Sequence, residues 1–186
     1  GKFATKSLRV VGTPITQLPA ADSVVLGRVQ QFNLKNDWGV VIKPDETNPI
    51  RVWVSPGVSS SLRDSALTFW TRKLGVQFQF VSDSSLAVYT VDTTYVGTSC
   101  GSNAISSLAQ GRIIKSEIKI KLAAPCGQAR QLAHEVGHAL GYGGHNKNGE
   151  DMMSSDAAGW FLSDPSNGFF MWIRSPVIFP GERPIF

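Results

Sequence analysis

All three histidines of this 186-residue chain lie within twelve residues, in the stretch HEVGHALGYGGH at positions 134–145. Residues 128–140 carry apolar side chains at three- and four-residue steps, which predicts an amphipathic helix that ends at Gly141. On this helix His134 and His138 are four residues apart, so their imidazoles project from one face about one turn from each other. That spacing allows both rings to bind one metal ion at a Zn–N distance of about 2.0–2.1 Å.

The third histidine, His145, can reach the same ion only if the chain leaves the helix. In a continued helix it would stand seven residues beyond His138, about 10.5 Å along the axis, which is too far to share a tetrahedral ion. Gly141 can take the left-handed conformation that ends a helix, and Gly143 and Gly144 favour a tight return. We therefore predict a site formed by all three histidines.

Glu135 follows the first histidine and is rotated by about 100° from it on the helix. It cannot easily be a third ligand, but its carboxylate can reach a water on the metal. This is the helical HExxH arrangement, with two ligands and a general base. One alternative remains open for the third ligand, in which His145 misses the ion and Asp151 or a water completes the site.

The histidine pattern resembles that of the metzincin clan of zinc endopeptidases, HExxHxxGxxH. The spacing here, HExxHxxGxxxH, is one residue longer, which we interpret as an extra glycine in the return. Met153 stands eight residues after His145 and resembles the Met-turn methionine that packs beneath the metal in this clan. Ser155 stands where astacin-like enzymes carry a tyrosine, and the subfamily stays unassigned.

The resemblance implies a Zn²⁺-dependent endopeptidase in which the three histidines hold the ion and Glu135 is the general base. Its partner would be an extended peptide or protein substrate lying beside an edge strand, for which residues 113–115 are the candidate. Two alternatives are kept. One is a gluzincin-type peptidase whose third ligand is a glutamate, either Glu150 or Glu182. The other is a non-catalytic, zinc-stabilised binding module, which would have no use for Glu135.

The remaining patterns predict an α+β domain with one mixed sheet. The resemblance adds a mostly parallel sheet, a backing helix, an active-site helix and a small irregular C-terminal subdomain with a late helix. A boundary near residue 48 separates an N-terminal extension or pro-segment, residues 1–48, from a catalytic domain, residues 49–186. Strands are expected at 23–29, 38–42, 50–54, 76–81, 85–91 and 113–122, helices at 59–74 and 167–174, and a long loop at 97–110.

Charge, hydropathy and cysteine usage limit the function further. Lys and Arg number 18 against 14 Asp and Glu, and the basic residues are scattered, so a nucleic-acid partner is not expected. No apolar stretch approaches the ~18 residues that cross a bilayer. Cys100 and Cys126 are predicted to form a disulfide, with two buried thiols as the alternative. A disulfide would indicate a secreted or extracytoplasmic protein, which we expect to be a monomer.

Overall fold

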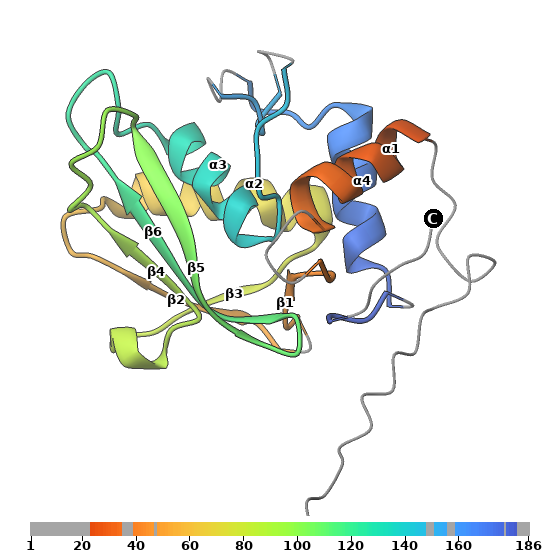
Figure 1. Cartoon of the computed structure of the whole chain (residues 1–186). Helices are drawn as coiled ribbons and strands as arrows, with labels where there is room; N and C mark the ends of the chain where they lie inside the picture. Colours follow the sequence, from red (N-terminus) through yellow and green to blue (C-terminus); the bar gives the residue numbers. More distant parts are fainter. Residues whose placement is uncertain are drawn as a thin grey trace, which may run out of the picture.

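The computed structural model describes residues 23–34, 39–46, 48–147, 151–155, 159–176 and 178–181. A twisted sheet lies at one side of the molecule, α3 packs against its strands β5 and β6, and α2 packs against α3 (Figure 1). Helices α1 and α4 contact each other on the side away from the sheet. The α-helices are α1 (Ser23–Val29), α2 (Ser60–Leu74), α3 (Ala129–Ala139) and α4 (Asp164–Arg174).

The sheet has six strands in the order β1-β6-β4-β2-β3, with β5 paired to β6. Only the β5–β6 pair is antiparallel, and every other pairing is parallel. The predicted mixed, mostly parallel sheet of an α+β domain is therefore confirmed. The strands are β1 (Lys43–Pro44), β2 (Ile50–Val54), β3 (Phe78–Phe80), β4 (Tyr89–Asp92), β5 (Gly101–Ala109) and β6 (Arg112–Ile120).

Helix α2 begins and ends at the residues that its sequence signals indicate. The Ser59 hydroxyl accepts a hydrogen bond from the Leu62 amide at 3.3 Å, and Gly75 ends the helix with a φ of 71°. The buried indole of Trp70 donates a 2.8 Å hydrogen bond to the Ala133 carbonyl of α3. α2 thus supports the histidine-bearing helix from behind.

The strand predicted at residues 23–29 is wrong, because these residues form α1. Val25 and Val29 lie one helical turn apart and are both buried, which is the period of a helix with one apolar face. Val25 packs against Gly168 of α4, where an added Cβ would stand 2.6 Å from a valine methyl group. Packing against another helix decided the conformation of this short, β-branched run. The strand predicted at 38–42 is also wrong over residues 39–42, which the structure describes as irregular, and the two-residue strand β1 (Lys43–Pro44) follows them.

The loop predicted at residues 97–110 is also wrong over most of its length, because Gly101–Ala109 forms β5. Gln110 and Gly111 close the hairpin to β6 with φ values of 52° and 76°. Strand β5 therefore covers residues 113–115 of β6, so these residues are not a sheet edge. On this side of β6, β5 is the edge strand of the described sheet, because it pairs with β6 alone.

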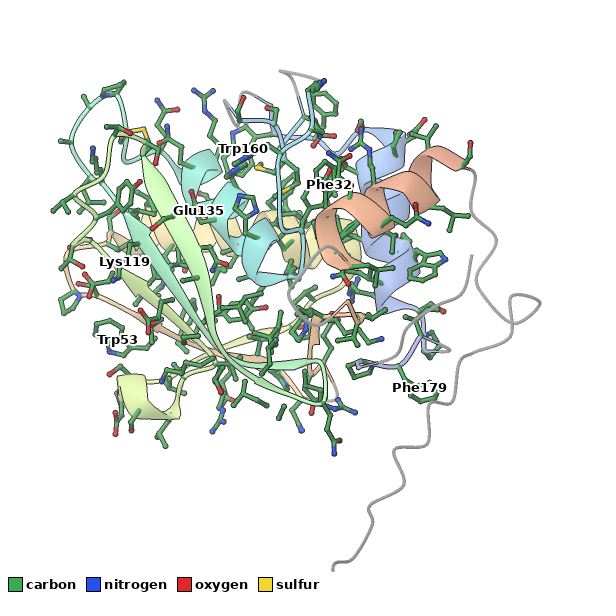
Figure 2. All side chains as sticks on the ribbon, in the orientation of Figure 1. Phe32, Trp53, Lys119, Glu135, Trp160 and Phe179 are labelled. Atoms are coloured by element: carbon green, nitrogen blue, oxygen red, sulfur yellow. A yellow bond between two sulfur atoms is a disulfide. The ribbon has the colours of Figure 1, made fainter. Side chains whose placement is uncertain are left out.

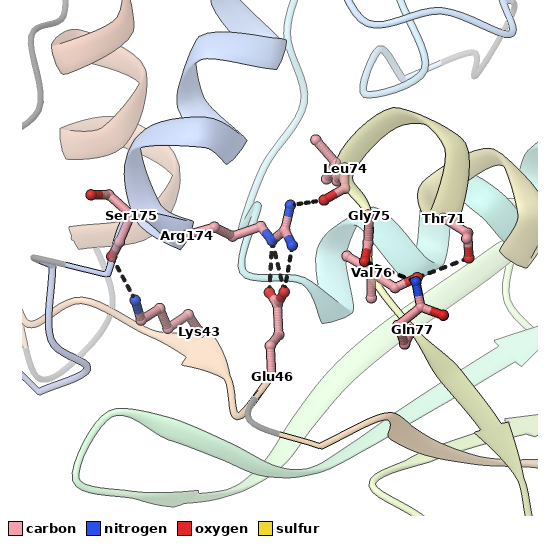
Figure 3. A network of polar contacts seen from close by, with 9 residues as sticks. All are labelled: Lys43, Glu46, Thr71, Leu74, Gly75, Val76, Gln77, Arg174 and Ser175. Atoms are coloured by element: carbon pink, nitrogen blue, oxygen red, sulfur yellow. Dashed lines mark hydrogen bonds and ion pairs between the residues drawn. The ribbon is translucent and has the colours of Figure 1, made fainter.

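Arg174 links the end of α4 to the segment after β1 and to the end of α2 (Figure 3). Its Nε and Nη2 atoms donate to the Glu46 carboxylate at 2.8 and 2.6 Å, and its Nη1 atom donates to the Leu74 carbonyl at the end of α2. Lys43 of β1 donates to the Ser175 carbonyl at 3.2 Å. The predicted late helix is thus present and fixed to the sheet and to α2.

Residues before position 48 contribute to the same hydrophobic core as the rest of the chain. Val29 and Val41 are completely buried, and Ile42 is 5% exposed. The division into an extension and a catalytic domain stays a prediction. No helix in the described part of the chain is long and apolar enough to cross a bilayer.

Candidate metal centre

Helix α3 carries the first two histidines and is fixed to its surroundings along its length. Gln128 caps its start through a reciprocal pair of hydrogen bonds with Gln131. Near its end, the Tyr89 phenol of β4 donates a 2.7 Å hydrogen bond to the Ala139 carbonyl. The helix stops at Leu140, and Gly141 follows with a φ of 103°, which confirms the predicted glycine stop.

The three histidines converge, as the spacing predicted. The Nε2 atom of His134 lies 3.0 Å from that of His138 and 3.0 Å from that of His145. Tetrahedral ligands bound at 2.0–2.1 Å would stand about 3.3 Å apart, close to these distances. His134 is buried, His138 is half-buried and His145 is exposed, so the cluster opens to solvent on one side. These residues can hold a metal ion.

Hydrogen bonds fix the tautomers of the two helical histidines. The Nδ1 atom of His134 lies 2.7 Å from the Met152 carbonyl, and that of His138 lies 2.5 Å from the Tyr142 carbonyl. Because a carbonyl oxygen only accepts, each Nδ1 must carry the proton, and each neutral ring turns a lone pair on Nε2 toward the other. Backbone carbonyls that accept from the other ring nitrogen orient metal-bound histidines in the same way.

At neutral pH, His134 and His138 carry no additional proton that could bridge their Nε2 atoms. Burial, with a smaller contribution from the nearby histidines, lowers the pKa of His134 to about 4 and that of His138 to about 3. Burial also lowers the pKa of His145. The Nε2 lone pairs of His134 and His138 face each other at 3.0 Å, and a cation between them would remove their repulsion. The donor set therefore fits a metal ion.

Glu135 lies beside the cluster, on the side of α3 that faces β5 (Figure 2). Its side chain is buried, and burial raises its pKa to about 7. Gly101, the first residue of β5, leaves room for it, because a Cβ there would stand 2.9 Å from the carboxylate Oε1 atom. The carboxylate and the histidines line one cleft of about 990 Å³. Tyr95, Asn103, Gln131 and Ser155 also line this cleft.

The turn at residues 151–154 packs beneath the cluster. Met153 is completely buried against Gly137, and its carbonyl accepts a 3.0 Å hydrogen bond from the Asn146 amide. Asp151 binds the amides of Met153 and Ser163 with its two carboxylate oxygens, both at 2.7 Å. Asp151 is therefore used to build the turn, and the alternative that it completes the metal site has no support in this geometry.

Cys100 and Cys126 are disulfide-bonded, with their Cα atoms 5.2 Å apart, as predicted. Cys100 directly precedes β5, and Cys126 lies three residues before α3. The bond thus joins the start of β5 to the start of α3, the helix that carries Glu135. The two glutamates of the gluzincin alternative, Glu150 and Glu182, lie outside the described residues.

Two contributors to this site were not predicted from the sequence. Gly101 lies in the stretch for which the sequence predicts a loop, and Asn33, whose side chain donates to the Gly141 carbonyl just after α3, carries no signal in the sequence. No known protein-family model matches this chain, and no curated protein sequence matches it either.

Proposed function

We propose that this protein is a zinc-dependent endopeptidase of the metzincin type, with His134, His138 and His145 as metal ligands. The observation that carries the proposal is the convergence of three histidine Nε2 atoms in an open cleft that a buried carboxylate also lines. Three neutral imidazoles with a free fourth position are a donor set typical of catalytic zinc, whereas structural zinc sites are closed and are commonly built with cysteines. In this chain both cysteines are used in the disulfide.

A bound zinc ion would polarise the scissile carbonyl and lower the pKa of a water to about 7. Glu135 would accept a proton from the attacking water and pass it to the leaving amine. Its pKa of about 7 arises from burial alone, and a cation beside it would lower this value, so that the carboxylate is ionised and able to act as a base at neutral pH.

The substrate of this proposal is an extended peptide lying along β5. Residues 101, 102, 103 and 105 of this strand line the cleft, and β5 pairs in the described sheet with β6 alone. Its outer main-chain groups suit the addition of a further strand. β5 replaces residues 113–115 as the candidate edge. The disulfide supports a secreted or extracytoplasmic location, because such bonds persist in oxidising compartments.

The substitution Glu135→Gln tests the proposal, because it keeps the shape of the side chain and removes the base. We expect the variant to retain one zinc per chain by elemental analysis. Its cleavage of an unfolded protein substrate should fall by about 10²–10⁴-fold or more. Glu117→Gln is the matched control, since Glu117 lies on β6, is not among the residues that line the cleft, and should leave cleavage unchanged.

Two outcomes would reject the proposal. Full turnover by Glu135→Gln would remove Glu135 from the mechanism. Zinc-loaded wild-type protein that cleaves no unfolded substrate would favour the zinc-stabilised binding module.

A further inference from the structure

The residues between the second and third histidines form a return loop, residues 141–145, that has little stiffness of its own. Three of its first four residues are glycine, and glycine loses more conformational freedom on folding than any other residue. The loop is also one residue longer than the metzincin pattern. Contacts from elsewhere in the chain must therefore hold His145 at the cluster.

Asn33 supplies the first of these contacts. Its side chain is buried, and its Nδ2 atom donates to the Gly141 carbonyl at 2.9 Å and to the Ile42 carbonyl at 2.7 Å. Its Oδ1 atom accepts from the Ile42 amide at 3.0 Å. The asparagine thus joins the point where the chain leaves α3 to the segment before β1. Buried polar groups bonded in this way are costly to remove.

Phe32, the preceding residue, supplies the second contact. The Gly143 amide donates a 2.5 Å hydrogen bond to the Phe32 carbonyl. A Cβ on Gly144 would stand 2.5 Å from the Phe32 ring, so the ring lies directly on the loop. The same ring stacks on Tyr142, with the centroids 4.8 Å apart. Figure 2 shows Phe32 at the end of α1, next to the chain that follows α3.

Both residues belong to one π-helical turn, Gln30–Leu34, that continues α1. This turn is held in its own place, because Arg28 of α1 donates to the Tyr142 hydroxyl at 3.1 Å and to the Ser166 hydroxyl of α4 at 2.5 Å. The successive loop residues 141, 142, 143 and 144 are therefore each contacted by Arg28, Phe32 or Asn33.

We propose that Asn33 and Phe32 are positioning residues for the third metal ligand, His145. The turn Gln30–Leu34 then supports the metal centre and is not separable from it. This inference rests on the metal site of the proposed function, but it does not require Glu135 or turnover.

A double-mutant cycle on metal affinity tests the inference. We expect Asn33→Ala to weaken zinc binding, measured by chelator competition, by about 10–100-fold, the range for residues that orient a ligand from behind. In a His145→Ala background the same substitution should change the affinity by less than about threefold, because the ligand that it positions is already absent. Co²⁺ absorption spectra of Asn33→Ala should likewise approach those of His145→Ala.

Two further variants separate positioning from general loss of stability. Val29→Ala removes buried methyl groups from α1 without a hydrogen bond to the loop, and should lower stability while leaving zinc affinity unchanged. Phe32→Leu is a milder change that keeps the chain folded and should show a smaller loss of affinity with the same dependence on His145.

Equal effects of Asn33→Ala in the two backgrounds would overturn the inference and leave the proposed function standing. The same holds for an effect matched by Val29→Ala. A wild-type chain that binds no divalent cation would overturn both.

Discussion

The sulfur atom of Met153 packs so closely against Gly137 that a Cβ on this glycine would stand 2.3 Å from it. Trp70 of α2 closes the other side of the gap, where the same Cβ would stand 2.8 Å from the indole Cζ2 atom. Both side chains are completely buried. Gly137 lies on α3 one residue before His138, so the turn below the histidines and the helix above them are in contact through a residue without a side chain.

The substitution Gly137→Ala should therefore destabilise the protein by about 1–3 kcal/mol through overpacking, although alanine favours a helix by about 1 kcal/mol relative to glycine. Gly27→Ala in α1 is the control, since a Cβ there meets nothing within 4 Å and its stability change should be neutral or favourable. Chemical denaturation of the metal-free variants measures both effects. A stability gain at both positions would contradict the packing argument.

The buried carboxyl of Glu135 should make the metal-free protein less stable as the pH rises. Its pKa is about 7 in the folded chain against an ordinary value of 4.5, because burial disfavours the charged form. Between these values the unfolded state releases a proton that the folded state keeps, so the contribution of Glu135 to stability falls from about pH 4.5 to about pH 7.

Glu135→Gln removes that dependence. The stability difference between the variant and the wild type should rise by a few kcal/mol between pH 4.5 and 7.5 in favour of the variant. Denaturation midpoints measured with a chelator present check this. A difference that does not change with pH would mean that the carboxyl is ionised in the fold.

The two helical histidines should act in the opposite direction on acidification. Their pKa values are about 4 for His134 and about 3 for His138 in the folded chain, below the ordinary 6.5. As the pH falls below 6.5 the unfolded state gains protons that the folded state refuses, so stability is lost from pH 6.5 down toward pH 4. Urea unfolding of metal-free Glu135→Gln between pH 7.5 and 5 measures this loss, which should become smaller after replacement of both histidines by alanine.

Much of the candidate site could be predicted because its signals are local. The four-residue step between His134 and His138, the periodicity of α3 and the glycine after it all depend on the geometry of one helix. The return of His145 to the other two histidines was predicted correctly because glycine at 141, 143 and 144 permits a return that a continued helix forbids. All of these signals lie within residues 128–145.

Elements that depend on distant partners were predicted poorly. Residues 23–29 have β-branched residues that favour a strand, yet packing against α4 makes them a helix. Residues 101–109 are mostly small or polar, and they are extended because β6 offers a ladder of backbone groups. Asn33 had no signal in the sequence, because its role arises from two carbonyls at Gly141 and Ile42 that are remote from each other along the chain.

The disulfide should contribute measurably to stability, because it closes a long loop. Cys100 and Cys126 are separated by 26 residues, for which the chain-entropy model gives roughly 3–4 kcal/mol. We expect Cys100→Ser combined with Cys126→Ser to lose about this much free energy of unfolding. A reductant should lower the denaturation midpoint of the wild type to that of the double variant, and it should leave the variant itself unchanged, which serves as the control. Because the bond joins the start of β5 to the start of α3, the helix that carries Glu135, the variant should also cleave an unfolded substrate more slowly while binding zinc as the wild type does. Unchanged stability in the double variant would show that the loop is already fixed by its other contacts and that the bond adds nothing to them.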